Sequence, residues 1–188
     1  METCFSSQSR QQFRQYFQPS RLVVGVVSGD SCGTINLITL SFNTHCSYKP
    51  LMMAFSIHNS TYSYPLFQRA AQCVLAVPGE GLAQEVLECG ILSGRRVNKL
   101  KKFNLKLEKS QNIDTQGLRG CIANIELVIR QRIEVGDSMM LIAEVMSYRV
   151  NTSIRQRNLL SLGPRTAGYE VLASKGIHRI GAYTATRS

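Results

Sequence analysis

A loop rich in hydrogen-bonding side chains spans residues 58–63. The six residues His58, Asn59, Ser60, Thr61, Tyr62 and Ser63 carry four hydroxyls, an amide and an imidazole. Residues 65–71 then read as a short helix, for which Ser63 is a suitable cap. Free N–H groups and the dipole at a helix start favour an anion. The loop is typical of a phosphate site, but Ser, Thr and Asn are equally common in plain caps and turns, so composition leaves both interpretations open.

A second polar stretch, residues 36–47, precedes this loop. It carries Asn36, Thr39, Ser41, Asn43 and Thr44, enough donors and acceptors to meet the polar edge of a flat heteroaromatic ring. Threonine also occurs in half-buried strands for packing reasons. Taken with the loop, this stretch predicts that residues 33–63 hold a phosphate-bearing cofactor.

Other reactive residue types form no convincing site. His45 and Cys46 are adjacent, but neighbours on a strand point to opposite faces, which disfavours a base and nucleophile pair. Three histidines and scattered carboxylates make a poor metal site. The six cysteines form no Cys-x-x-Cys pair and read as reduced thiols. We therefore predict no catalytic side chain and no metal ligand.

The net charge of +10 means that the surface attracts anions. Two basic groups, expected in loops or at strand ends, supply much of this charge: Arg95, Arg96, Lys99, Lys101, Lys102 and Lys106, then Arg155 and Arg157. Each can also be an ordinary solvated face. Nucleic-acid binding is disfavoured because no aromatic residues are interleaved with the basic ones.

The length of 188 residues, 44% of them hydrophobic, suits one compact domain. The apolar stretches are far shorter than the roughly 20 residues of a membrane span, so no membrane association is expected. Residues 1–21 lack the apolar core of a secretory signal, which favours a cytoplasmic protein. A transit peptide is the alternative, because Arg10, Arg14 and Arg21 lie among serines.

The remaining segments predict a mainly β protein. Residues 21–28 and 34–42 read as a hairpin around the turn 29–33, and residues 51–57, apolar on both faces, as a strand in the middle of a sheet or barrel. Further segments follow: strands 73–77, 121–132 and 139–150, a helix at 81–89, and a last short strand near 177–183. Strand and helix do not alternate, and no Gly-x-Gly-x-x-Gly motif occurs, so a β-barrel with helical additions is expected.

The order of several short segments resembles the flavin reductase-like family of FMN-binding split barrels. The resemblance rests on residues 17–23, 37–51, 58–63, 101–103, 136–145 and 176–181. It implies a split β-barrel with short peripheral helices over residues 17–188, after an N-terminal extension of residues 1–16. Two positions depart from the family's pattern: Ser138 stands where a histidine is frequent, and Lys49-Pro50 replaces a double proline.

The resemblance also implies roles for particular residues. Thr39, Ser41 and Thr44 would face the flavin ring and ribityl chain. Ser56, Ser60, Thr61 and Ser63 would approach the phosphate, with Lys102 as counter-charge. Three further residues complete the cofactor set: Asn36, Asn43 and His58. His178 and Arg179 would lie on the nicotinamide side.

The function implied is that of a homodimeric NAD(P)H-dependent flavin reductase, with FMN as cofactor and NADH or NADPH as substrate. Such chemistry needs no catalytic side chain, because hydride passes directly between the two cofactors. The basic surface permits the extra phosphate of NADPH. Free flavin, ferric iron, oxygen and a partner monooxygenase remain open as acceptors. The alternative is a protein that holds FMN for electron transfer or storage without nicotinamide turnover.

Overall fold

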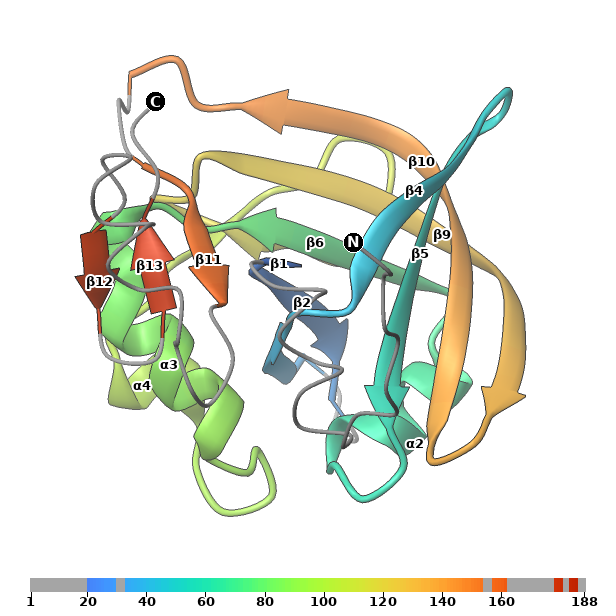
Figure 1. Cartoon of the computed structure of the whole chain (residues 1–188), viewed down its shortest axis with the longest axis horizontal. Helices are drawn as coiled ribbons and strands as arrows, with labels where there is room; N and C mark the ends of the chain where they lie inside the picture. The colour runs from blue at the N-terminus through green and yellow to red at the C-terminus, as the bar shows by residue number, and fades with distance from the viewer. Residues whose placement is uncertain (1–19, 30–32, 154–156, 162–177, 181–182, 186–188) are drawn as a thin grey trace, which may run out of the picture.

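The computed structural model describes residues 20–29, 33–153 and 157–161, and the backbone of residues 178–180 and 183–185. A seven-stranded antiparallel sheet dominates it and curls around an apolar interior (Figure 1). In spatial order its strands are β3 (Ile35–Leu40), β2 (Val23–Ser28), β6 (Gln72–Val77), β9 (Ala123–Val135), β10 (Ser138–Val150), β5 (Leu51–His58) and β4 (Asn43–Tyr48).

Smaller elements lie around this sheet. The second sheet has the order β1 (Ser20–Arg21), β11 (Leu159–Ser161), β13 (Tyr183–Ala185) and β12 (His178–Ile180), and β7 (Leu107–Glu108) pairs with β8 (Gly117–Leu118). The helical elements are α2 (Ser63–Arg69), the 3-10 turn η1 (Glu80–Leu82), α3 (Ala83–Ile91) and α4 (Lys99–Lys102). None of the helices in the described ranges is long and apolar enough to cross a membrane.

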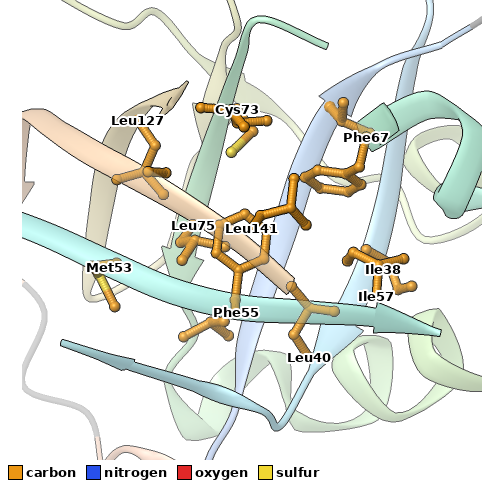
Figure 2. Packing of buried hydrophobic residues seen from close by; sticks show 14 of the residues in the cluster. Ile38, Leu40, Met53, Phe55, Ile57, Phe67, Cys73, Leu75, Leu127 and Leu141 are labelled. Atoms are coloured by element: carbon orange, nitrogen blue, oxygen red, sulfur yellow. The ribbon is translucent and has the colours of Figure 1, made fainter. Parts of the chain in front are cut away.

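Two apolar clusters cover opposite faces of the β2, β3 and β6 strands. Val23 and Val27 of β2 belong to the interior cluster, which also contains Phe55 and Phe67. The side chains of this cluster converge from several strands and from α2 (Figure 2). Val24 and Val26 face a second cluster beneath α3. Burial on both faces explains why residues 21–28 show a continuous apolar run rather than alternation.

The predicted strands and their structural counterparts agree in most places, and the mainly β class is confirmed. The predicted arm 34–42 ends at Leu40, because the chain bends at Ser41 and continues as the separate strand β4. The single strand predicted near 177–183 is instead two short paired strands, β12 and β13. Strand 51–57 lies inside the sheet, as predicted: β5 pairs with β10 on one side and with the edge strand β4 on the other.

Two local predictions also need correction. Tyr62, not Ser63, precedes helix α2, no side chain caps that helix, and Ser63 is its first residue. Part of the first basic group forms α4 rather than a loop, because Asn98 caps it by accepting the Lys101 N–H at 3.0 Å.

Candidate functional site

Two adjoining pockets lie between β3 and the segment that joins α3 to α4. The hydroxyl pocket, about 200 Å³, is lined by Ile38, residues 60–63, residues 89–94 and Lys99. The arginine pocket, about 240 Å³, is lined by Gly29, residues 34–37, Tyr62 and residues 94–99. Both share Tyr62, Gly94 and Lys99. Strand β3, the loop before α2 and the segment after α3 therefore meet at one place.

A buried hydrogen bond joins two of the sequence-predicted residues. Asn36 points to the interior side of β3, where its Nδ2 donates to Ser63 Oγ at 2.8 Å. Both side chains are buried. This bond fixes the start of α2 against β3, so that Ser60, Thr61 and Ser63 line the hydroxyl pocket together.

Gly94 lets the α3–α4 segment approach this hydrogen bond closely. A Cβ at Gly94 would lie 2.0 Å from Asn36 Oδ1 and 3.0 Å from Tyr62 Cδ1. Any side chain here would push Asn36 or the segment itself aside. A glycine is thus required for the wall that the two pockets share.

Lys99 places a buried cation between the two pockets. Its side chain is 5% exposed, and Nζ donates to the Leu37 carbonyl at 2.6 Å and the Cys89 carbonyl at 2.7 Å. Burial lowers the pKa of this amine. No carboxylate in the described part of the chain forms an ion pair with it. An ammonium has three donors, and a buried cation is stabilised by an anion, so this environment suits a phosphate.

Lys99 is the residue that the sequence prediction missed. The predicted counter-charge, Lys102, is exposed on α4, where its Nζ lies 5.6 Å from the Phe103 ring centre, and it lines neither pocket. Helical spacing was the one signal for it, and a weak one, because α4 has only four residues. Leu100 and Phe103 pack against the second cluster, and Lys99 lies one turn before Phe103, which turns it inward.

Arg95 and Arg96 extend the positive charge to the mouth of the arginine pocket. Both side chains are exposed, and the Arg95 guanidinium lies 5.8 Å from the centre of the Tyr62 ring. Neither arginine forms an ion pair with a described carboxylate. In the other basic group, Arg157 instead donates to Glu80 Oε2 at 2.5 Å. Arg155 lies outside the described residues.

His58 organises the loop before α2. Its Nδ1 accepts the Ser60 N–H at 3.1 Å and lies 2.8 Å from Ser60 Oγ, while its Nε2 lies 3.5 Å from Asp137 Oδ2. The Thr61 hydroxyl donates to the His58 carbonyl at 2.8 Å. The loop therefore holds its hydroxyls in place through the imidazole and main chain of His58.

The other predicted residues lie away from the two pockets. The Thr39 hydroxyl donates to the Val86 carbonyl of α3 at 2.5 Å, and Asn43 Nδ2 donates to the Arg21 carbonyl at 3.0 Å. Thr44 is exposed and Ser41 is half-buried. Ser56, between the core residues of β5, faces outward. The roles expected for these five residues stay predictions.

The nicotinamide-side residues His178 and Arg179 fall in β12, and their side chains lie outside the described residues.

One cysteine, Cys89, lines the hydroxyl pocket. The four described cysteines, Cys46, Cys73, Cys89 and Cys121, are free. Burial raises the pKa of Cys89 to about 11 and that of Cys121 to about 12, so both stay protonated at neutral pH. Within the described ranges no three His, Cys, Asp or Glu side chains gather as metal ligands would.

Comparison with known proteins decides the family. Residues 19–167 match the model of the flavin reductase like domain. The chain belongs to this flavin reductase-like family. An uncharacterised protein of Archaeoglobus fulgidus is 29% identical over 132 residues, which cover 70% of this chain and 73% of the relative.

Solved structures show the same fold at low sequence identity. An FMN-binding protein of Thermus thermophilus with bound p-hydroxybenzaldehyde has a TM-score of 0.77 at 18% identity, covering 99% of this chain and 97% of its own. An NADH:FAD oxidoreductase of Streptomyces globisporus has a TM-score of 0.70 at 15% identity, covering 85% and 93%. The flavin reductase-like fold expected from the sequence is thereby confirmed.

Proposed function

We propose that this member of the flavin reductase-like family is an NAD(P)H-dependent flavin reductase that binds FMN at the hydroxyl pocket. The observation that carries the proposal is the buried Lys99 ammonium, which lies beside the hydroxyl loop without a carboxylate partner among the described residues. Phosphate oxygens are suitable partners for a buried cation and for hydroxyl donors.

Different residues would supply the charge and the hydrogen bonds that hold the phosphate. Lys99 would supply the charge, and Ser60 and Ser63 would supply hydroxyl donors, whereas Thr61 would have to exchange its bond to the His58 carbonyl for one to the phosphate. Asn36 would orient the Ser63 hydroxyl through the bond already present. Thr39, Ser41 and Thr44 remain the contacts expected for the ring and ribityl chain, and Ser56 remains one expected for the phosphate.

The names of two structural neighbours support this proposal. One is an FMN-binding protein and the other an NADH:FAD oxidoreductase. When bound, a flavin supplies the hydride acceptor, and the protein contributes binding, orientation and electrostatics. We therefore assign the described side chains to holding and positioning, and none to proton transfer.

A homodimer is part of the proposal, and an exposed apolar row supports it. Phe42, directly before β4, lies opposite Ser56 of β5. Ser56 lies opposite Met140 of β10, and Met140 opposite Ile133 of β9, so these side chains share one outer face of the sheet. Phe42 is 63% and Ile133 46% exposed. Apolar rows of this kind are a common feature of protein interfaces.

The test of the enzymatic proposal is anaerobic mixing of the flavin-loaded protein with NADH or NADPH. We expect the flavin absorbance to bleach with one or both nicotinamides. Flavin that stays oxidised with both would overturn the reductase proposal and favour the second candidate, an FMN-binding protein for electron transfer or storage. That candidate has its own support in the neighbour named only for FMN binding. A cytoplasmic location and the identity of the acceptor, including a partner monooxygenase, remain proposals.

A further inference from the structure

We propose that the arginine pocket binds the phosphate groups of the adenosine half of a dinucleotide. This inference deepens the proposed function, on which it rests, by naming a second anion site beside the one assigned to the flavin phosphate. It predicts that Arg95 and Arg96 act on ligands with an adenosine diphosphate group and have little effect on FMN.

The charge of the pocket supports this assignment. Arg95, Arg96 and Lys99 line it together with the amides of Asn36 and Asn98, and its described lining contains no Asp or Glu. Arginine is well matched to phosphate because its planar guanidinium can form two parallel hydrogen bonds. The chemistry of the described wall is therefore that of a phosphate site.

The arginine pocket adjoins the hydroxyl pocket, and this position suits a ligand that has one phosphate in each of the two pockets. Lys99 and Gly94 line this pocket and the hydroxyl pocket alike. Each pocket alone is smaller than a typical ligand site of roughly 300–1,000 Å³, whereas the two joined fall within that range. Lys99 keeps one donor beyond its bonds to the Leu37 and Cys89 carbonyls, and its charge lies beside both pockets.

The basic residues between 95 and 106 differ in position: some line the arginine pocket, and others lie on an ordinary solvated face. Arg95 and Arg96 line the arginine pocket, whereas Lys101 and Lys102 are exposed on α4 and line neither pocket. The two pairs carry the same charge and lie close in sequence. They therefore provide variants that are matched in the charge removed and differ in whether the residues line the pocket.

The direct probe is ADP, titrated calorimetrically into flavin-free protein. The double variant Arg95→Ala/Arg96→Ala should weaken ADP binding by about tenfold or more, because charge-assisted hydrogen bonds are lost. The matched variant Lys101→Ala/Lys102→Ala should stay within about twofold of wild type, because exposed charges contribute little. Circular dichroism checks that both variants fold.

The outcomes separate this inference from the proposed function. No ADP binding to wild type, or equal losses in the two variants, would overturn the inference. ADP binding that depends on the arginines in a protein that fails to bind FMN would support the inference and overturn the proposed function. FAD, NADH and NADPH, titrated next, identify the source of the group: the one whose affinity falls in the arginine variant, while FMN affinity holds, is the ligand.

Discussion

Among single residues, the candidate site depends most on Lys99. Its ammonium is buried against two main-chain carbonyls, and burial without a carboxylate partner in the described chain leaves a charge that an anionic ligand can stabilise. Lys102, three residues on, has the same charge but lies in solvent. The contrast between these two lysines tests whether position or charge matters.

We expect Lys99→Met to weaken FMN binding by about tenfold or more, since a charge-assisted contact to the phosphate would be lost. The same change should alter the free energy of unfolding by less than about 1–3 kcal/mol, because the cost of leaving the Leu37 and Cys89 carbonyls without a donor is offset by removal of the buried charge. Flavin fluorescence titration and urea denaturation measure the two effects. Lys102→Met is the control, and an FMN affinity unchanged in Lys99→Met would contradict the assignment.

The pH dependence of flavin affinity follows from the lowered pKa of Lys99. Burial holds this pKa below the ordinary value of 10.5, so the folded protein without ligand loses the proton more readily than the unfolded chain. The charged form therefore destabilises the fold below the folded-state pKa, and this penalty disappears as pH rises toward 10.5. A bound phosphate favours the charged form instead.

We therefore expect wild-type affinity for FMN to fall as pH rises through the alkaline range below 10.5, where the charge of the ligand phosphate is constant. Titrations between neutral pH and that limit measure it. Lys99→Met should show a flatter profile. A profile identical in wild type and variant would show that Lys99 does not hold the phosphate.

Composition pointed to the hydroxyl loop, and the structure brings Ser60, Thr61 and Ser63 to one pocket. Composition could not single out Lys99. A run of basic residues does not say which amine is buried, and α4 has only four residues, too few for a clear periodic pattern. Pairing between distant segments, such as Asn36 with Ser63, also has no local signal.

Among the elements, strand β2 needs a glycine to pack against the core. A Cβ at Gly25 would lie 3.1 Å from Phe67 Cζ and 3.2 Å from side-chain atoms of Ile38 and Leu40. We expect Gly25→Ala to lower the free energy of unfolding by about 1–3 kcal/mol, because the core must shift to admit the methyl group. Gly33→Ala is a poor control because φ is positive there. Ser28→Ala, exposed at the end of β2, is the better one, and equal stability of the two variants would refute this packing account.

A buried carboxylate fixes the loop before β8. Glu126 on β9 is fully buried and accepts the N–H groups of Gln111 at 2.9 Å and Asn112 at 2.8 Å. Glu126→Gln puts a donor where an acceptor is needed, so we expect a loss of about 1–3 kcal/mol and faster amide exchange at those two residues. Glu144→Gln, which breaks the more exposed pair with Arg130, should cost less than about 1 kcal/mol. Unchanged exchange in Glu126→Gln would rule out this anchoring role.

The long strands could be predicted because β-branched residues and alternation mark them, as in β9 and β10. Strand β4 escaped prediction because it is an edge strand whose residues, Asn43–Tyr48, are largely polar and exposed. Strands β12 and β13 have three residues each, too few to show a period. Edge strands and very short strands are specified by their neighbours rather than by their own sequence.

For the whole molecule, the exposed apolar surface bears on whether the protein forms a dimer. The row from Phe42, directly before β4, across β5, β10 and β9 leaves Phe42 and Ile133 exposed on one outer face. We expect sedimentation at micromolar concentration to give a dimer, and Phe42→Asp/Ile133→Asp to shift it toward monomer with circular dichroism unchanged, because charges disfavour an apolar interface. Lys101→Asp/Lys102→Asp on α4 is the control. A wild-type monomer would contradict the dimer.

The central claim is that the cleft between β3 and the α3–α4 segment recognises a flavin by its phosphate. The most direct measurement is a comparison of FMN with riboflavin, which lacks that phosphate, by fluorescence titration of the wild-type protein. Because Lys99 and the hydroxyl loop are assigned to the phosphate, we predict that FMN binds at least about 100-fold more tightly, which corresponds to roughly 2.7 kcal/mol. Equal affinity for the two flavins, or no binding of either, would contradict the account.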